Sequence, residues 1–511
     1  MSQENATQPR LLVNVVDAKA KSDPQSSWLL YAEKNGGYQT ITWKQLADAV
    51  NKTARWLDDN LPQEGPGQTI AYSGPNDARY YILVVAAAKS KRRFFIPDGR
   101  ITSDGLAKIL KEIRCTAWIS AHDRPSTVPG QQSLVFPSLE DILSEDGDPI
   151  TPYSWNTVFS RHHPRKITYR HMANARTLTA CPPQWIAGLG FCLNAAAYIG
   201  LVTVMLPPDM DMSNRQGIMD ICKQTGARSI ITPPSLIENF WTDKPTFDFL
   251  KSLDYVCWLG ATLNHKVGDE LAQHTNLFSV IGSTERAAQL SFVSNDVKMW
   301  NSYEFVPEMG PRFELVADDH YELHIDRTAE SDLFQCGFYT FPELKTMGTE
   351  ELYSPIFGKH GAKRWIFRSR KDDLVKLSWL AKFRATNIEK AIAGHPSVTS
   401  VVVGGEGHEV PYVITEPRDR SLVGDHEKFI NEIYDTVIYG VNEKDIDEIR
   451  IPREMVMLSD PALPFKRSVK MTIMRKEVEK MYEEHIESLY KRWRMTKMHN
   501  GVLNGVKGVD Q

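Results

Sequence analysis

Segments with helical spacing of apolar residues alternate along this chain with short β-rich runs. The clearest helical pattern is the segment 41–60, which Thr42 can cap at its start. Its apolar residues recur near every third or fourth position, at Leu46, Val50, Ala54 and Leu57. The β-rich runs are short, as in 116–120, 201–206 and 228–233. This alternation predicts an α/β fold, with a large multi-layer N-terminal domain that has mainly parallel sheets.

The segment from Trp185 to Leu206 carries no charged residue and is long enough to imitate a membrane span. Gly200 divides it into a helix-like half and a β-rich half, and Pro207 and Pro208 end it. A buried helix that leads into a buried parallel strand explains this pattern better than a membrane span. We therefore expect no transmembrane segment here.

A chain of 511 residues is too long for one hydrophobic core. A second pattern begins near Asp372, with an amphipathic segment at 387–396, a β run at 397–405 and a charged helix at 475–493. The sequence therefore predicts a large domain over 1–371 and a small, mobile α+β domain over 372–511.

Charge and cysteine content restrict the partners and the compartment. The formal net charge is −4, which gives no general attraction to nucleic acid or to an anionic membrane. Six dispersed cysteines form no CxxC pair, and the polar N-terminus lacks the apolar core of a secretory signal. These features predict a cytoplasmic protein with reduced cysteines, without nucleic-acid or membrane partners.

Seven segments resemble, in order, those of one enzyme superfamily. They are SGPNDARYYILVVAAAKSKRRFFIP (73–97), LGATL (259–263), VIGSTE (280–285), FELVADDHYELHI (313–325), FYTFPELKTMGTEELYSP (338–355), WIFRSRKDD (365–373) and LPFKRSVKMT (463–472). The superfamily is that of adenylate-forming enzymes, which includes acyl-CoA synthetases and adenylation domains. The chain is most similar to adenylation domains of fungal carboxylate-reductase-like and nonribosomal-synthetase-like (NRPS-like) enzymes.

The resemblance implies roles for individual residues. Gly282, Ser283, Thr284 and Glu285 match a nucleotide-binding segment, in which the glutamate helps to hold Mg²⁺ and ATP and the threonine lies near the nucleotide. Glu351 and Arg370 stand where an aspartate and an arginine contact ribose, so the carboxylate at 351 is one methylene longer.

Two further matches concern the small domain. Asp372 matches the hinge about which that domain swings, and Lys466 matches its catalytic lysine. In the superfamily that lysine stabilises the charge developing on the acid and the α-phosphate. An acyl pocket is expected around Trp185, Gly188, Gly260 and Ala261, with Trp185 at its entrance.

The segment 158–171 departs from the superfamily. Relatives carry a loop of the form TSGSTGxPK, whose backbone N–H groups and hydroxyls hold the β- and γ-phosphates. This chain has no glycine there, and Arg165 replaces the lysine. The ribose and adenine side of the nucleotide site is thus mostly kept, whereas the triphosphate side is remade.

Two interpretations of this basic segment remain open. It is either a solvated charged face or an anion site in which side-chain cations replace backbone amides. In the second case Arg165 binds a carboxylate or phosphate, and His163 acts as general acid or base. A metal site at His162 and His163 is not expected, because adjacent residues rarely point the same way.

Three functions therefore remain. The first is an enzyme that no longer relies on ATP and acts on a small acyl or carbonyl metabolite by acyl transfer, condensation or cyclisation, in secondary metabolism. The second is a stand-alone acid-activating ligase, the one case that requires ATP and Mg²⁺, with Mg²⁺ at Glu285. The third is a non-catalytic partner of a synthase. In relatives a carrier and a reductase domain often follow, so we expect a carrier protein or CoA to act in trans.

Overall fold

The computed structural model of the chain describes residues 12–34, 36–61, 68–97, 101, 103–144, 171–211, 214–317, 319–358, 361, 363–371, 374–378, 382–422, 425–444, 449–467 and 473–505. The chain divides into two compact units. The first comprises Met1–Glu314, His324–Gly348 and Ser354–Phe367, and the second comprises Leu315–Leu323, Thr349–Tyr353 and Arg368–Gln511.

An eight-stranded sheet forms the centre of the first unit, in the order β12-β11-β10-β9-β7-β8-β1-β2. Its parallel strands are β1 (Ser27–Ala32), β7 (Arg176–Thr179), β8 (Val202–Met205), β9 (Ser229–Thr232), β10 (Tyr255–Leu259) and β11 (Asn276–Ser283). The edge strands β2 (Tyr38–Thr42) and β12 (Ala287–Gln289) run antiparallel to their neighbours. This sheet confirms the predicted α/β class with largely parallel strands.

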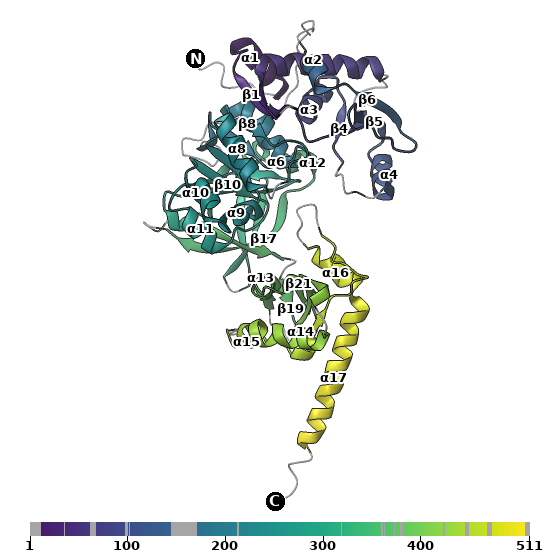
Figure 1. Cartoon of the computed structure of the whole chain (residues 1–511), viewed down its shortest axis with the longest axis vertical. Helices are drawn as coiled ribbons and strands as arrows, with labels where there is room; N and C mark the ends of the chain where they lie inside the picture. The colour runs from purple at the N-terminus through teal and green to yellow at the C-terminus, as the bar shows by residue number, and fades with distance from the viewer. Residues whose placement is uncertain are drawn as a thin grey trace, which may run out of the picture. The chain divides into compact units, whose positions relative to one another are not determined.

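Helices connect these strands and cover the sheet. They include α8 (Arg215–Thr225), α9 (Pro234–Trp241), α10 (Lys244–Lys251) and α11 (His265–Leu271), which Figure 1 shows around β10. The strands between them are almost entirely buried, as expected for a parallel sheet covered on both faces.

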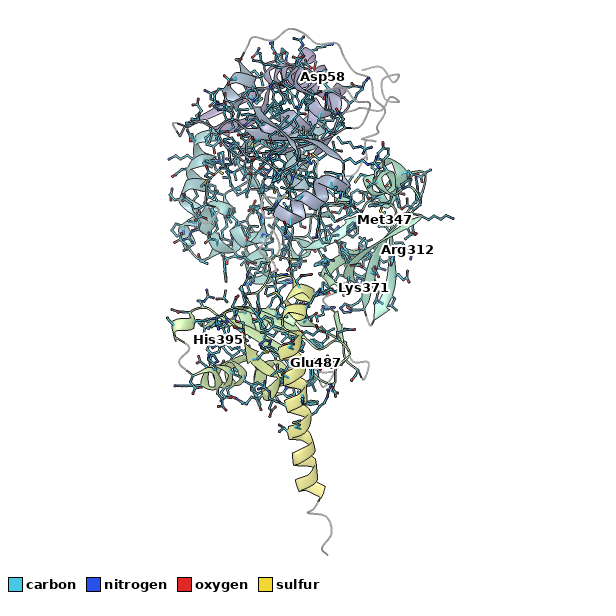
Figure 2. All side chains as sticks on the ribbon, turned by 90° about the vertical axis from the view of Figure 1, so that its right-hand side faces the viewer. Asp58, Arg312, Met347, Lys371, His395 and Glu487 are labelled. Atoms are coloured by element: carbon cyan, nitrogen blue, oxygen red, sulfur yellow. The ribbon has the colours of Figure 1, made fainter. Side chains whose placement is uncertain are left out.

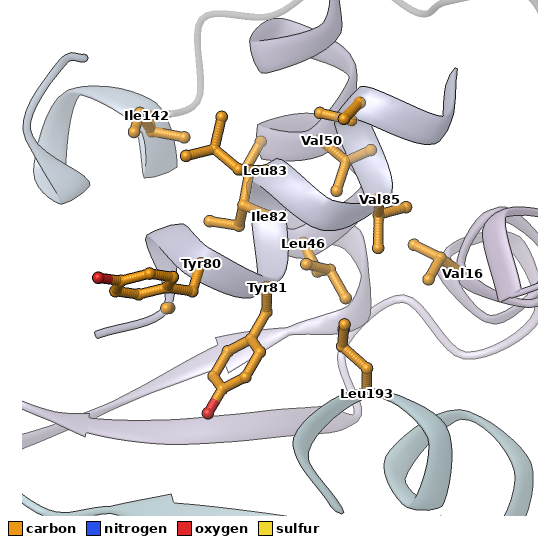
Figure 3. Packing of buried hydrophobic residues seen from close by; sticks show 14 of the residues in the cluster. Val16, Leu46, Val50, Tyr80, Tyr81, Ile82, Leu83, Val85, Ile142 and Leu193 are labelled. Carbon is orange, nitrogen blue, oxygen red and sulfur yellow. The ribbon is translucent and has the colours of Figure 1, made fainter. Parts of the chain in front are cut away.

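A four-stranded sheet in the same unit is entirely parallel, in the order β4-β3-β5-β6. Its strands are β3 (Thr69–Ser73), β4 (Arg93–Phe95), β5 (Cys115–Ala121) and β6 (Gln132–Phe136), and α4 (Ser103–Glu112) connects β4 to β5. A buried core lies among α1 (Leu12–Ser22), α2 (Trp43–Asn60) and α3 (Arg79–Lys89), where Figure 3 shows Leu46, Val50, Ile82 and Val85.

The segment predicted as a helix at 41–60 forms α2. Thr42 caps it as expected, because its side chain accepts from the Gln45 N–H at 3.2 Å while the Gln45 side chain accepts from the Thr42 N–H at 2.9 Å.

The uncharged segment forms a helix followed by a strand. The helix consists of α6 (Ile186–Leu189), the π-helical η3 (Gly190–Ala195) and α7 (Ala196–Ile199), and it ends at Gly200 with a φ of 74°. The indole N–H of Trp28 donates to the Cys192 carbonyl at 2.8 Å, so β1 supports the π-helical turn. No helix among the described residues is long and apolar enough to cross a membrane.

A six-stranded sheet has the order β13-β14-β18-β17-β16-β15. Its strands are β13 (Ser291–Phe292), β14 (Ser302–Phe305), β15 (Pro311–Ala317), β16 (His320–Asp326), β17 (Thr346–Phe357) and β18 (Lys363–Arg370). Parts of these strands belong to each unit. The predicted boundary at residue 372 stays a prediction, and Asp372 itself lies outside the described residues.

The rest of the second unit is an α+β arrangement around a sheet of order β21-β22-β23. Its strands are β21 (Val398–Gly404), β22 (Tyr412–Pro417) and β23 (Val456–Leu458), beside the hairpin β19 (Leu374–Lys376) and β20 (Lys382–Arg384). Its helices include α13 (Ala385–Ala393), α14 (His426–Ile433), α15 (Tyr439–Lys444), α16 (Arg475–Met481) and α17 (Glu483–Gly505). The α17 residues Ile486, Leu489, Tyr490 and Trp493 are buried, whereas Glu487, labelled in Figure 2, lies 3.8 Å from His408 Nε2.

Candidate active site

The strand order of the eight-stranded sheet reverses its direction between β7 and β9. The chain passes from β7 to β8 on one side, and then from β9 through β10 to β11 on the other. In open α/β sheets, ligands bind outside the carboxyl ends of the strands at such a reversal. The segments that follow β7, β10 and β11 are those that contain the predicted acyl and nucleotide residues.

The GSTE turn (Gly282–Glu285) lies at this edge, where β11 turns back into β12. Ser283 pairs with Ala287, which has a φ of 56°, and Gly282 pairs with Ala288. A Cβ on Gly282 would lie 2.2 Å from the Ala287 carbonyl oxygen, so the tight hairpin requires glycine there. Thr284 and Glu285 are exposed at the tip.

The side chains of the GSTE turn fit a nucleotide. The Ser283 hydroxyl is buried and forms no hydrogen bond within the part of the chain that the structure describes. A buried unpaired hydroxyl is costly, and a polar ligand atom would satisfy it. The Thr284 hydroxyl and the Glu285 carboxylate add a hydrogen-bonding group and an oxygen ligand suited to Mg²⁺.

Gly260 and Ala261 follow β10, and both are exposed. Gly260 has a φ of 89°, a left-handed conformation that glycine adopts without strain. Because Leu259 pairs with Val280 in parallel register, this turn and the GSTE turn leave the sheet at the same edge. The structure therefore brings the predicted acyl and nucleotide segments side by side.

Trp185 is half-buried and lies at the same edge. It packs against the buried cluster that contains Cys257 and Phe278, as do Leu259 and Val280 from the ends of β10 and β11. Its role as the gate of an acyl pocket stays a prediction. A small hollow in this unit lies elsewhere, lined by Ser279, Phe292, Trp300 and Tyr303 among others.

Backbone packing and hydrogen bonds fix the segment around Trp185. A Cβ on Gly188 would lie 2.2 Å from the Pro182 carbonyl oxygen, so glycine allows a close approach there. The Gln184 amide donates to Asn76 Oδ1 at 2.6 Å and to the Tyr80 hydroxyl at 3.1 Å. The segment is thereby connected to the turn that follows β3.

Asp77, in that turn, belongs to an ionic cluster around the buried Arg79. Its carboxylate pairs with Arg79 at 2.6 Å, and Arg79 also pairs with Asp123 at 2.9 Å. Burial raises the pKa of the Asp77 carboxyl, although the hydrogen bonds from Arg79 oppose this. The segment 73–97, which contains Asp77 and Arg79, resembles the corresponding segment of the superfamily. The resemblance implied no role for these two residues.

Glu351 and Arg370 belong to the second unit. The Glu351 carboxylate accepts a hydrogen bond from the Tyr353 hydroxyl at 2.8 Å. Arg370 lies 3.6 Å from the carboxylate of Glu350, and both side chains are exposed. Two carboxylates and a guanidinium therefore occupy neighbouring positions on β17 and β18.

Lys466 is exposed, and its Nζ lies 3.3 Å from the Glu477 carboxylate. Its backbone carbonyl accepts from the Met474 N–H at 2.9 Å. The neighbouring Arg467 forms an ion pair with Glu416 at 2.7 Å.

Several predicted site residues cannot be placed. His163, Arg165 and the rest of the basic segment up to Arg170 lie outside the described residues, as does Asp372. Among the described residues, no group of three or more His, Cys, Asp or Glu side chains could hold a metal ion.

A parallel α/β sheet with glycine-containing turns at its carboxyl edge is typical of the α/β proteins that bind small molecules at a switch point of the sheet. Models of two families match this chain: "AMP-binding enzyme" over residues 16–162 and "AMP-binding enzyme C-terminal domain" over 372–494. The chain belongs to the adenylate-forming superfamily, as the sequence resemblance implied.

Relatives of known name agree with this membership. The chain is 24% identical to a carboxylic acid reductase of Neurospora crassa, in an alignment that covers 94% of this chain and 50% of the relative. It is also 24% identical to the isocyanide synthase-NRPS hybrid crmA of Aspergillus fumigatus, covering 95% of this chain and 34% of the relative. The chain thus spans half or less of the length of these two relatives.

Solved structures show the same fold. The O-succinylbenzoate coenzyme A synthetase of Bacillus subtilis in complex with AMP superposes with a TM-score of 0.65 at 14% identity, covering 91% of this chain and 97% of that one. ATP-bound MatB of Rhodopseudomonas palustris superposes with a TM-score of 0.66 at 13% identity, covering 93% and 99%.

Proposed function

We propose that this chain is an enzyme that binds a small acyl or carbonyl metabolite at the carboxyl edge of its eight-stranded sheet without relying on ATP for activation. The observation that carries the proposal is a contrast. The GSTE turn and the Gly260 turn leave the sheet together, whereas the segment 158–171 contains none of the glycines of a phosphate-gripping loop.

The residues matched to the ribose and adenine side of the nucleotide site all carry groups that suit a polar ligand. The Ser283 and Thr284 hydroxyls and the Glu285 carboxylate offer hydrogen-bonding groups that suit a nucleotide or a polar acyl group. Glu351 offers a hydrogen-bond acceptor to ribose hydroxyls. Lys466, paired with Glu477, supplies a positive charge for a developing oxyanion once the pair opens.

The segment 158–171, which replaces the phosphate-binding loop of relatives, is the reason to expect weak binding of ATP. Hydrogen bonds to charged groups contribute roughly 1.5–3 kcal/mol each. The loss of two or three such bonds weakens the grip on the triphosphate on the order of 100-fold or more. The nucleotide-monophosphate part is affected less, because its contacts come from other segments. We therefore expect AMP to bind at least as tightly as ATP.

The test is isothermal titration with AMP and with ATP, both in Mg²⁺, together with ATP–pyrophosphate exchange over a broad panel of carboxylic acids. We expect AMP binding without exchange. Robust exchange with any natural acid contradicts the proposal and establishes the acid-activating ligase.

The ligase is the second candidate, because ATP-bound MatB shares this fold and Glu285, Glu351 and Lys466 are present. In that reaction a carboxylate oxygen attacks the α-phosphorus of ATP, pyrophosphate leaves and an acyl-adenylate forms. A carrier protein or CoA would then accept the acyl group. A non-catalytic partner of a synthase is the third candidate, and binding of neither nucleotide nor acyl metabolite would favour it.

A further inference from the structure

Three consecutive residues, Gln335, Cys336 and Gly337, contact the hairpin that carries Glu285. We call them the clamp segment. Gln335 is 2% exposed and faces Gln289 of β12, which is 3% exposed. The Gln335 amide N–H donates to the Gln289 oxygen at 3.0 Å, and the Gln289 amide N–H donates to the Gln335 oxygen at 3.3 Å. The two amides therefore form a reciprocal buried pair.

Gln335 is itself firmly held. Its amide also donates to the Met309 carbonyl at 3.0 Å, and its backbone N–H donates to the Ser331 carbonyl at 2.8 Å. Ser331 is fully buried. These bonds fix the Gln335 side chain independently of the hairpin. Its hydrogen bonds with Gln289 can therefore hold the Gln289 side chain in one position.

The other two residues of the clamp segment lie close to the tip of the hairpin. The Cys336 sulfur lies 3.8 Å from the Glu285 carbonyl oxygen. A Cβ on Gly337 would lie 3.4 Å from the same oxygen and 2.6 Å from the Met347 sulfur. The clamp segment therefore touches the hairpin at β12 and at its turn.

The hairpin has need of such support. β12 is only Ala287–Gln289, and it is the last strand at its edge of the eight-stranded sheet. A short two-stranded hairpin is marginal in water without further packing. A displacement of about 1 Å in a binding group can cost a large part of its effect.

We propose that Gln335 and Gln289 are positioning residues that set the orientation of the GSTE turn and hence of the Glu285 carboxylate. The role of the turn in ligand binding rests on the function proposed above, whereas the positioning itself does not. The alternative is that the amide pair contributes only to stability.

Three variants separate these alternatives. Gln335→Leu leaves the Gln289 amide unpaired in the core. The double variant Gln289→Leu/Gln335→Leu replaces both amides by apolar groups of similar size, which recovers much of the lost stability but no directional bond. The matched control is Asn442→Leu, because Asn442 is a buried amide of the second unit that bonds the backbone of Ile451 at 2.9 and 3.0 Å.

Two readouts are needed: hydrogen–deuterium exchange of peptides covering 280–290 without ligand, and titration with AMP in Mg²⁺. We expect both Gln335 variants to raise exchange in this region and to weaken AMP binding about tenfold, even where the double variant melts like the wild type. Asn442→Leu should lower thermal stability without either effect.

The proposal is overturned if the double variant regains wild-type exchange and affinity together with its stability, or if Gln335→Leu leaves exchange at 280–290 unchanged. If the wild type binds neither AMP nor an acyl metabolite, the proposed function fails, but the exchange measurements still decide the positioning role. The two failures are therefore distinguishable.

Discussion

Arg165 and His163 are the residues whose substitution best separates a remade site from a decayed one. An arginine at the mouth of the site can bind a carboxylate through two hydrogen bonds, and a histidine can move a proton. We predict that Arg165→Ala or His163→Ala lowers ligand affinity or turnover roughly tenfold to a hundredfold, since a charge-assisted contact contributes about 1.5–3 kcal/mol. Titration and initial rates measure this.

The control for these variants is Lys244→Ala, which removes a cation from α10 whose side chain is 87% exposed. It should change neither affinity nor rate. If a variant with alanine at Arg161, His162, His163 and Arg165 keeps full activity, the segment is a solvated face and the anion-site interpretation is wrong.

Trp185 gives a second prediction for a single residue. It packs at the edge where β10 and β11 end, so Trp185→Ala should remove apolar contact with an acyl group and weaken its binding roughly tenfold. Competition titration with acyl ligands of increasing length measures the effect. Unchanged affinity for every ligand removes Trp185 from the site.

Sequence alone indicated some of these residues and could not indicate others. The sequence indicates Glu285 as a candidate because it stands in a short contiguous segment whose pattern resembles that of a family. Gln335 and Gln289 were missed because their pairing joins residues 46 positions apart. A single buried glutamine also leaves no periodic signal in a sequence.

At the scale of elements, the contact of α17 with the rest of the second unit gives a pH-dependent prediction. Arg494 of α17 donates to both oxygens of Glu409, at 2.8 and 2.9 Å. The hydrogen bonds from Arg494 lower the pKa of Glu409 to about 2. A carboxyl group whose pKa is lowered by folding stabilises the fold above its unfolded pKa, which is about 4.3, and loses this effect as the pH falls toward 2.

We predict that Arg494→Met lowers the stability of the second unit slightly at pH 7, by less than about 1 kcal/mol, because the pair is largely exposed. The difference from the wild type should shrink as the pH falls from about 4.5 toward 2. Thermal unfolding followed at several pH values measures this. A difference that is constant over this range contradicts an electrostatic origin.

Elements with a strong local pattern were predictable. The segment 41–60 became α2 because its apolar period and its capping residues agree. The break between α16 and α17 near Tyr482 was not predicted, because the charged pattern over 475–493 continues across it. The π-helical turn at Gly190–Ala195 was not predicted either, since its Trp28 contact joins residues far apart in the chain.

At the scale of the whole molecule, the two units have separate buried cores. One cluster contains Leu46, Val50 and Tyr81, and another contains Val401, Val413 and Ile433. Separate cores predict unfolding that is not two-state. Differential scanning calorimetry should therefore give a calorimetric enthalpy larger than the van't Hoff enthalpy. Equal enthalpies would show that the units unfold together.

The two-part organisation was expected from length and from the change of pattern near Asp372. The assignment of Leu315–Leu323 and Thr349–Tyr353 to the second unit was not expected. These strand segments lie far from residue 372 in the sequence, and only sheet pairing shows which unit they join. The candidate ribose residue Glu351 lies in one of them.

The distribution of thiols has a practical consequence for measurement. Five of the six cysteines are buried, and Cys336 alone is partly exposed. Burial raises the pKa of the Cys336 thiol, so alkaline conditions will favour its labelling. A thiol-reactive fluorophore would be attached to the Cys336 sulfur, which lies 3.8 Å from the Glu285 carbonyl oxygen. The unmodified sequence thus already contains one attachment point for an optical reporter of what arrives at the GSTE turn.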